Sequence, residues 1–354
     1  MKILTDEDVV KYLDTHLLKE LLVNEFIVSL AKGLITYSTD PDKIVPPRIA
    51  QLSNNPESDT THLYMPCISP DEVGIKIISG GPSNNSKGLG FTGGVLILNE
   101  ITGSIEALLN GTNLTAFRTA LASILGVHKV IGDKEILPEL TVFGVGLQSY
   151  WHIKLCLILY SDKIKQVNII NRTLENAEKL KHRLSKQFPS IQFNIFSYKI
   201  ESHLQEIKNH CQNSSIIFGC SPSLEPIIMY DYINQSHEYP TFISLIGSYK
   251  PHMIELDLKL IDHMKQTNTK ILVDSIEHCL HESGELIQGN VEAQNLLEIT
   301  DLYKYKDDSI ISSTIDPQFN LTIQKIVGLS IMDINIGKYI VDHSNTEGIV
   351  INNF

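Results

Sequence analysis

The chain has 354 residues, of which 42% are hydrophobic and 20% are charged, and its formal net charge at pH 7 is −12. This length is enough for two domains that each bury a core. An acidic surface does not attract nucleic acid or an anionic membrane, so we expect neither as a partner. Any anion must therefore bind in a local basic pocket. The N-terminus carries no apolar segment of a secretory signal, and no run reaches the roughly 18 apolar residues of a membrane span.

The five cysteines are scattered and include no Cys-x-x-Cys pair. This pattern offers no disulfide framework and is typical of reduced thiols, so we expect a cytoplasmic protein. His278, Cys279 and His281 lie close together but have no distant fourth ligand. We interpret them as surface helix residues and expect no metal.

The N-terminal third predicts helices followed by strands. Arg48 follows two prolines that stiffen its backbone. Residues 73–78 predict a strand in which Lys76, between two isoleucines, lies on the face opposite to theirs. From this pattern alone, Lys76 is either an exposed lysine or a functional one. Residues 94–98 and 105–109 predict a hairpin.

A long helix is then predicted from Gly111 to about Gly132. Small residues on one face of this helix allow close packing against a sheet or a cofactor. Arg118 and Thr119 lie in its first turns, where unpaired N–H groups and the helix dipole favour an anion.

Residues 140–173 are the stretch around which we expect the chain to be organised. A strand, a helix and a second strand follow one another as a β-α-β unit. The first turn has the pattern Gly-x-Gly-x-x-small and consists of Gly144, Val145, Gly146, Leu147, Gln148 and Ser149. Gly144 permits a tight bend, and Gly146 lets backbone N–H groups approach a pyrophosphate at the helix N-terminus. We therefore predict a dinucleotide site at this turn.

The residues after the second strand indicate which dinucleotide binds. NAD sites normally carry Asp or Glu there, but this chain has Asn171, Arg172 and Thr173, with Asn176 soon after. A guanidinium can hold a 2′-phosphate through a charge-assisted pair. We predict NADP(H) in preference to NAD(H). The alternative is that Arg172 is only a solvated loop residue.

The rest of the chain alternates short apolar runs with helical stretches, as a doubly wound parallel sheet requires. Ser221 and Pro222 follow one predicted strand, so we assign them to the cofactor site at the carboxyl edge of the sheet. Tyr249 follows the next predicted strand. Residues 321–341 predict one long helix.

Several motifs, in order and spacing, resemble the ornithine cyclodeaminase/mu-crystallin family over nearly the whole chain. They are Thr115-Ala-Phe-Arg-Thr119-Ala, Gly144-x-Gly-x-Gln148-Ser, Asn171-Arg-Thr173 with Glu175-Asn-Ala177-Glu-Lys, Glu255-Leu-Asp257, Val273-Asp274-Ser, Glu282-Ser-Gly284-Glu and Lys325-x-x-Gly328-Leu-x-x-x-Asp333. The resemblance implies an α/β fold with a Rossmann-type dinucleotide-binding domain, residues 119–314. It also implies an α+β substrate-binding and dimerisation domain built from both chain ends, residues 1–118 and 315–354, and hence a homodimer.

The resemblance also implies roles for single residues. Arg48, Lys76 and Arg118 match family residues that hold the substrate carboxylate and lie near the reacting carbon. A lysine there can donate a proton as hydride arrives. Arg118 and Thr119 are also assigned to cofactor binding.

One departure from the family pattern narrows the activity. Ornithine cyclodeaminases resemble one another in an aspartate that works on the substrate amine, and Tyr249 stands in its place here. A phenol with a pKa of about 10 is a poor base at neutral pH. Mu-crystallin-like members also lack the aspartate, carry Asn-Arg-Thr and reduce cyclic ketimines with NADPH. We therefore expect an NADP(H)-dependent oxidoreductase that reduces the C=N bond of a small cyclic imino acid, with Tyr249 in the substrate pocket.

Two other interpretations stay open. An amino-acid or opine-type dehydrogenase, or an ornithine cyclodeaminase-like enzyme, would release ammonia or reduce NADP⁺ in the presence of an amine. A mu-crystallin-type protein that retains NADPH and binds a small ligand would show no turnover. The intact set of Arg48, Lys76 and Arg118 argues against the second interpretation.

Overall fold

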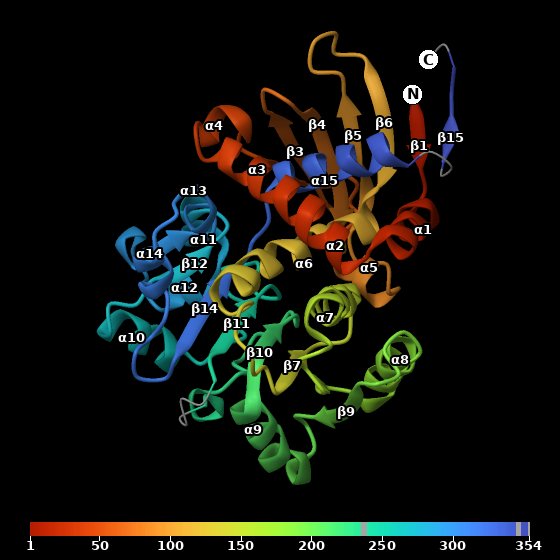
Figure 1. Ribbon diagram of the computed structural model, residues 1–354. Coiled ribbons are helices and arrows are strands. Elements are labelled where there is room, and N and C mark those ends of the chain that lie inside the picture. The colour runs from red at the N-terminus through yellow and green to blue at the C-terminus, as the bar shows by residue number, and fades with distance from the viewer. Residues whose placement is uncertain (235–238, 345–347, 353–354) are drawn as a thin grey trace. The chain divides into compact units, whose positions relative to one another are not determined.

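The computed structural model describes residues 1–234, 239–344 and 348–352. The chain divides into two compact units (Figure 1). Unit 1 consists of Met1–Thr119 and Gly328–Phe354, and unit 2 is Ala120–Val327. Residues 315–327, which the sequence assigns to the terminal domain, lie in unit 2, because strand β14 (Leu321–Lys325) pairs with two strands of its sheet.

Unit 1 is built on a seven-stranded sheet with the order β15-β1-β6-β5-β4-β3-β2. The strands are β1 (Lys2–Leu4), β2 (Ile49–Leu52), β3 (Thr61–Ile68), β4 (Val73–Gly80), β5 (Thr92–Leu98), β6 (Ile105–Asn110) and β15 (Ile349–Val350). Strands β2 to β6 pair antiparallel with one another, whereas β6 and β1 are parallel. Strand β1 also pairs with β15, so both chain ends enter one sheet. The helical segments are α1 (Asp6–His16), α2 (Lys19–Leu21), η1 (Leu22–Phe26), α3 (Ile27–Tyr37), α4 (Pro41–Ile44), α5 (Pro82–Ser86) and α15 (Ser330–His343). Helix α6 (Gly111–Val130) begins in unit 1 and ends in unit 2.

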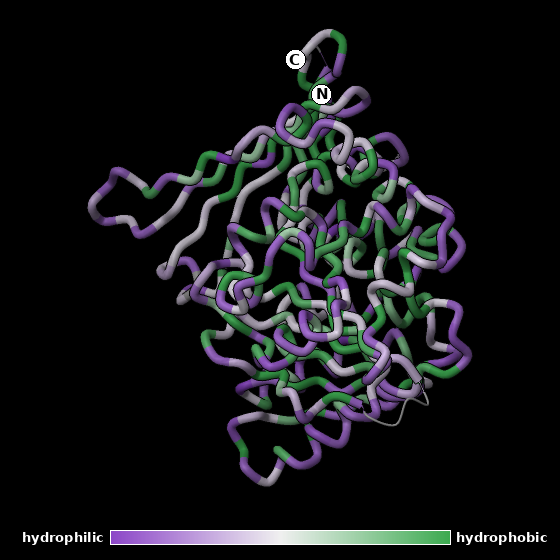
Figure 2. Tube along the Cα trace, turned by 90° about the vertical axis from the view of Figure 1, so that its left-hand side faces the viewer, coloured by the Kyte–Doolittle hydropathy of each residue, from purple (hydrophilic) through white to green (hydrophobic). Residues whose placement is uncertain are grey.

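Helix α15 packs across β3, β4 and β5 on one face of this sheet (Figure 1). Residues paired directly across the strands point to the same face, and Met65, Lys76 and Val95 point toward α15 and are buried. The opposite face carries Ile49, Tyr64 and Ile77, which are paired across β2, β3 and β4 and are 60%, 38% and 41% exposed. These strands therefore place apolar residues on both faces of the sheet. Figure 2 colours the backbone trace by the hydropathy of each residue.

Unit 2 is an eight-stranded parallel sheet with the order β13-β12-β14-β11-β10-β7-β8-β9. The other strands are β7 (Glu139–Phe143), β8 (Gln166–Asn171), β9 (Gln192–Ser197), β10 (Ser214–Gly219), β11 (Thr241–Leu245), β12 (Ile271–Val273) and β13 (Leu296–Glu298). The helical segments are α7 (Leu147–Tyr160), α8 (Leu174–Ser185), η2 (Glu201–His203), α9 (Leu204–Asn213), η3 (Tyr230–Tyr232), α10 (Leu258–Gln266), α11 (Ile276–Glu282), α12 (Gly284–Gln288), η4 (Ala293–Asn295), α13 (Asp301–Lys304) and α14 (Asp308–Ser312). The strand order runs from β7 to β9 in one direction and from β10 onward in the other. The point between β7 and β10 is thus the switch point of a doubly wound sheet.

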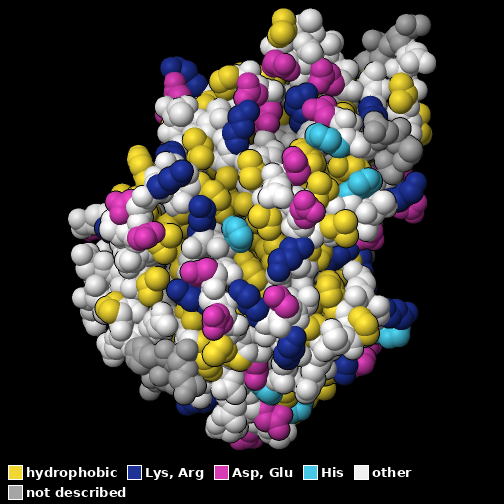
Figure 3. Space-filling model, in the orientation of Figure 1, with side chains coloured by type: hydrophobic (Ala, Val, Ile, Leu, Met, Phe, Trp, Pro, Cys, Tyr) yellow, Lys and Arg dark blue, Asp and Glu magenta, His cyan; other side chains and the backbone are white. Residues whose placement is uncertain are grey.

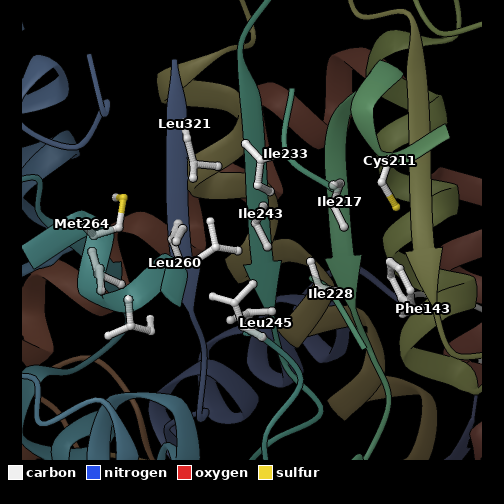
Figure 4. Close-up of a cluster of buried hydrophobic side chains, with 14 of the residues drawn as sticks. Phe143, Cys211, Ile217, Ile228, Ile233, Ile243, Leu245, Leu260, Met264 and Leu321 are labelled. Carbon is white, nitrogen blue, oxygen red and sulfur yellow. The ribbon is translucent and has the colours of Figure 1, made fainter. Parts of the chain in front are cut away.

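A cluster of buried apolar side chains fills the space between this sheet and its helices. Strands β10, β11 and β14 contribute Ile217, Ile243 and Leu321, and α10 contributes Leu260 and Met264 (Figure 4). All residues of these three strands are buried, as in a parallel sheet that is covered on both faces. The α/β fold class that the sequence predicts is confirmed.

One predicted element is wrong. Residues 321–341 do not form a single helix, because Leu321–Lys325 is strand β14 and the helix begins at Ser330. Gly328, with a φ of +88°, lies between them and breaks any continuous helix. The segment Leu321–Lys325 is short enough for either structure, and all five of its residues are buried between β11 and β12.

Acidic and basic side chains are interspersed over the face of the molecule drawn in Figure 3. In the described part of the chain, no helix is long and apolar enough to cross a membrane.

Candidate functional site

Unit 1 contains a buried ion cluster centred on Asp333 of helix α15. Lys76 Nζ of strand β4 donates to Asp333 Oδ1 at 2.8 Å and to Thr115 Oγ1 of helix α6 at 2.9 Å. Arg118 Nε of the same helix lies 3.1 Å from Asp333 Oδ2. Lys76, Arg118 and Asp333 are only 1%, 4% and 0% exposed. Two cations from two elements therefore share one carboxylate from a third.

Gly328 brings a second arginine to the edge of this cluster. Arg48 Nη2 donates to the Gly328 carbonyl at 3.3 Å. A Cβ at Gly328 would lie 2.7 Å from Arg118 Nη1, and its φ of +88° is also one that other residues rarely adopt. Only glycine therefore lets the Arg118 guanidinium lie against this backbone. The structure thus brings together the three predicted substrate residues, Arg48, Lys76 and Arg118.

The surroundings of Lys76 change its acidity. Burial lowers the pKa of Lys76 to about 8. The charge of Asp333 opposes this lowering, and the charges of Arg118 and Arg48 add to it. Burial raises the pKa of Asp333, but Arg118 and Lys76 outweigh it and hold that pKa below its ordinary value. A lysine with a pKa near neutrality can release a proton and regain it at physiological pH.

The sequence did not identify Asp333 as a site residue. A signal was present, because Asp333 is an acid among Ile331, Met332 and Ile334 in the apolar first part of helix α15. An acid in such a helix must find a buried cation. The period of two correctly placed Lys76 opposite its isoleucine neighbours, and the structure excludes the exposed lysine, since Ile77 points outward instead.

In unit 2, the glycine turn lies at the switch point of the parallel sheet. Gly144 directly follows β7, with a φ of +111°, and a Cβ there would lie 2.6 Å from the Cys220 carbonyl oxygen. The Cys220 N–H in turn donates to the Phe143 carbonyl at 2.8 Å. The turn after β7 and the loop after β10 are thus in backbone contact, at the edge where such sheets bind dinucleotides.

The start of helix α7 fits a pyrophosphate. Gly146 is its N-cap residue, no side chain caps the first turn, and a Cβ at Gly146 would meet nothing within 4 Å. The space beside this N-cap residue is therefore open, and an uncapped helix N-terminus favours an anion. Val145 and Leu147 flank this glycine, and the Gln148 Oε1 is buried with no hydrogen-bond partner in the described part of the chain.

The residues after β8 form an ordered polar turn without a carboxylate. Asn171 Nδ2 donates to the Thr173 carbonyl at 2.9 Å, and Asn176 Nδ2 to Thr173 Oγ1 at 3.4 Å. Arg172 is exposed, and no described acid forms an ion pair with it. The nearest acid along the chain, Glu175, pairs with Lys179 at 2.7 Å. Arg172 is therefore available to a ligand.

The remaining predicted site residues lie as follows. Thr119 is buried and donates to the Thr115 carbonyl at 2.7 Å. Ser221 and Pro222 follow β10, and Tyr249, which is half-buried, follows β11. Burial raises the pKa of Tyr249 above its ordinary value. No group of three or more His, Cys, Asp and Glu residues in the described part of the chain could hold a metal ion.

These features define the class of the protein. Unit 2 has the topology, turn and open helix N-terminus of a Rossmann-type dinucleotide-binding unit. The chain belongs to the ornithine cyclodeaminase/mu-crystallin family, whose model matches residues 9–348.

Named relatives are found at moderate identity. A Saccharomyces cerevisiae protein of uncharacterised function is 35% identical over 337 residues, 89% of this chain and 90% of that protein. The ketimine reductase mu-crystallin of Rattus norvegicus is 27% identical over 252 residues, 70% of this chain and 68% of that protein. A solved structure of Thermococcus litoralis Delta(1)-pyrroline-2-carboxylate reductase, in complex with NADH and L-proline, has a similar fold. Its TM-score is 0.76 at 22% identity, over 99% of this chain and 100% of that chain.

The buried cluster predicts a large effect of removing its carboxylate. The substitution Asp333→Asn leaves Lys76 and Arg118 without a counter-charge, and it should lower the free energy of unfolding by about 3–5 kcal/mol. Urea denaturation followed by circular dichroism measures the change.

The matched control is Asp342→Asn on the same helix. Asp342 is 49% exposed and lies 3.5 Å from Lys338, so its loss should cost less than about 1 kcal/mol. Equal losses in the two variants would show that Asp333 is not the counter-charge of the cluster.

Proposed function

We propose that the protein is an NADP(H)-dependent oxidoreductase that reduces the C=N bond of a small cyclic imino acid. The observation that carries the proposal is the buried cluster in which Lys76 and Arg118 share the single carboxylate of Asp333. The cluster keeps a positive charge that an amino or imino acid carboxylate would neutralise. The ketimine reductase and the pyrroline-2-carboxylate reductase among the relatives are named for reactions on such imines.

The residues of unit 1 would bind and protonate the substrate. The guanidinium groups of Arg48 and Arg118, both in contact with Gly328, would hold the carboxylate. Lys76 would donate its proton to the imine nitrogen as the electron pair of the C=N bond moves onto that nitrogen. Asp333 and Thr115 hold the Lys76 ammonium in place meanwhile.

The residues of unit 2 would hold the cofactor. Gly144, Gly146 and the first turn of α7 would bind the pyrophosphate, and Arg172 would bind the 2′-phosphate of NADP(H). When bound, the reduced nicotinamide supplies the hydride that adds to the imine carbon.

Tyr249 bears on the choice of reaction. With its pKa raised by burial, the phenol keeps its proton at neutral pH and can donate a hydrogen bond, but it cannot act as a base toward an amine. This favours imine reduction over ornithine cyclodeamination. The cysteines of the described residues are all free thiols, as in a reducing cytoplasm, and that is where we place this step of amino acid metabolism.

The proposal is tested by following oxidation of NADPH and NADH at 340 nm with a panel of cyclic and linear imino acids. We expect turnover with a cyclic imine and NADPH. The variant Lys76→Met should abolish turnover and leave NADPH affinity within a few-fold, because Lys76 belongs to unit 1 and the predicted phosphate ligands to unit 2. The control Lys338→Met removes a lysine of α15 that pairs with Glu106, outside the cluster, and should retain activity.

The pH profile gives a second readout of the same prediction. With a pKa of about 8, Lys76 loses the donated proton as pH rises, so kcat should fall about tenfold per unit above pH 8. A kcat that rises above pH 8, or near-full activity of Lys76→Met, would refute this role. Ammonia release would favour a dehydrogenase or cyclodeaminase, and NADPH binding without any turnover would favour a binding protein.

Cofactor preference should depend on Arg172. The variant Arg172→Ala removes the only cation of the turn after β8, so the dissociation constant of NADPH should rise about tenfold or more. That of NADH should change less than twofold.

A matched control is Arg183→Ala in helix α8. The Arg183 guanidinium lies 3.5 Å from the centre of the Tyr150 ring, where it has a packing role, so both dissociation constants should stay unchanged. Equal weakening of NADPH and NADH by Arg172→Ala would contradict the assignment of Arg172.

We further propose a homodimer in which the uncovered face of the sheet in unit 1 packs against a second copy. Support comes from Ile49, Ile68 and Ile77, which are 60%, 55% and 41% exposed on one face of neighbouring strands. Exposed apolar side chains gathered on one face of a sheet are typical of an interface. In β4 the usual pattern is inverted, since Lys76 points inward and its neighbours Ile75 and Ile77 point outward.

The variant Ile77→Asp should convert the dimer to a monomer, because it places a charge in the centre of this face. Size-exclusion chromatography with light scattering measures the mass. Leu204→Asp, at a 39% exposed leucine of α9 in unit 2, is the control and should remain dimeric. An unaltered chain that is monomeric, or an Ile77→Asp variant that stays dimeric, would rule out this interface.

A further inference from the structure

Unit 2 contains a second buried ion cluster that the proposed reaction does not use. Glu255, Glu285, Lys325 and Ser248 are all 0% exposed. Lys325, the last residue of β14, donates to Ser248 Oγ at 2.5 Å and lies 3.4 Å from Glu285 Oε2. Two carboxylates here share one cation. Buried charges are costly, and such a set persists only where its members satisfy one another and their surroundings.

Glu255 uses both carboxylate oxygens to bind backbone N–H groups. Oε1 accepts from the Ser221 N–H at 2.7 Å, in the loop after β10. Oε2 accepts from the Gly247 and Ser248 N–H groups at 2.7 and 3.1 Å, in the loop after β11. A single side chain therefore ties together two loops from neighbouring strands at the carboxyl edge of the sheet.

These loops also contact each other directly. A Cβ at Gly247 would lie 2.1 Å from the Ser221 carbonyl oxygen, and the Ile254 N–H donates to the Ser223 carbonyl at 2.9 Å. At Gly219, a Cβ would lie 3.0 Å from Glu255 Oε1. No larger residue fits at Gly247 without moving one loop away from the other.

The rest of the cluster holds Glu255 in place. The Glu255 N–H donates to Glu285 Oε1 at 2.7 Å, and the Ser248 hydroxyl donates to the same carboxylate. Burial raises the pKa of Glu255 to about 7, with Lys325 opposing the rise and Glu285 adding to it. Burial thus disfavours the charged form of the Glu255 carboxylate, and its three backbone N–H donors and Lys325 offset this unfavourable free energy.

The position of the loops in the topology gives the cluster a role. In a doubly wound sheet, the two sides of the switch point bind the two mononucleotides. The predicted phosphate and ribose ligands lie on the side of β7 and β8, whereas β10 and β11 belong to the other side. We propose that Glu255 is a positioning residue that sets the two loops forming the nicotinamide half of the cofactor site. This inference rests on the proposed function, because it presupposes a dinucleotide.

The test is the variant Glu255→Gln. The amide replaces one accepting oxygen by an NH₂ group, which would point a donor at a backbone N–H donor. Calorimetry with NADPH should show a dissociation constant at least about tenfold higher than that of the unaltered chain. Adenosine 2′,5′-bisphosphate, which lacks the nicotinamide half, should bind within twofold of the unaltered chain. Equal weakening of both ligands, or of neither, would overturn the inference.

Hydrogen exchange provides a readout that needs no cofactor. Peptides covering residues 219–224 and 246–254 should lose protection in Glu255→Gln, while those of strands β7 and β8 keep it. Unchanged protection in both loops overturns the inference whether or not a dinucleotide binds. If the unaltered chain binds neither NADPH nor NADH, the proposed function fails, and the exchange data alone decide whether Glu255 orders the loops.

Two further variants guard against general destabilisation. Ser248→Ala keeps the backbone N–H groups but removes the hydroxyl that joins Glu285 to Lys325. It should therefore also raise the dissociation constant of NADPH, even if Glu255→Gln does not fold.

Glu139→Gln alters a 14% exposed glutamate that accepts from Asn168 and His210 at the amino end of β7. It should leave the affinity for NADPH and the protection of both loops unchanged. If Glu139→Gln matched Glu255→Gln in both measurements, the inference would be wrong.

Discussion

The arrangement of unit 1 depends on one buried carboxylate. Lys76 and Arg118 come from a strand and a helix, and neither cation would tolerate burial without a counter-charge. Asp333 supplies it from a third element, α15. Because one carboxylate serves two cations, the cluster keeps a net positive charge, and its members are at most 4% exposed. A small anion that enters it gains a charge-assisted interaction whose partners are already oriented.

Unit 2 contains the reverse arrangement. Glu255 and Glu285 share Lys325, so two buried anions depend on one cation. Both counter-ions come from a short stretch of chain, since Lys325 ends β14 and Asp333 lies in the first turn of α15. Gly328, between them, supplies the backbone against which Arg118 lies. The motif Lys325-x-x-Gly328-Leu-x-x-x-Asp333, which contributes to the family resemblance, thus contains the balancing charge of each unit.

The local parts of the fold could be predicted from the sequence, and the partnerships between distant parts could not. The β-α-β unit and its glycine turn are encoded by neighbouring residues and were found in place. The helix predicted over residues 321–341 is wrong because the five residues Leu321–Lys325 are too few to distinguish a strand from a helix, and only their place between β11 and β12 makes them a strand. Lys76 was assigned to the right side of its strand. Which side is buried depends on Asp333, 257 residues further along the chain.

The same limit explains why the sequence does not predict a role for Glu255 and Glu285 of unit 2. Glu255 and Glu285 stand in motifs, but their partners are backbone N–H groups of loops, which no side-chain pattern reveals. An acid that is fully buried yet accepts several backbone N–H groups fixes conformation, whereas an acid paired with mobile cations can be displaced. Glu255 therefore holds the backbone of two loops in unit 2.

The overall charge and the buried clusters have different consequences for selectivity. A net charge of −12 repels polyanions and anionic surfaces at long range. The positive charge of unit 1 is buried, so under the proposed function the substrate is small enough to leave water and reach it and carries a carboxylate or a similar anion. In that function, size and charge would be selected together, and the lowered pKa of Lys76 would add a proton donor at the point where the anion is held. Burial thus accounts for the lowered pKa of Lys76 and, in the proposed function, for the selectivity of the cluster.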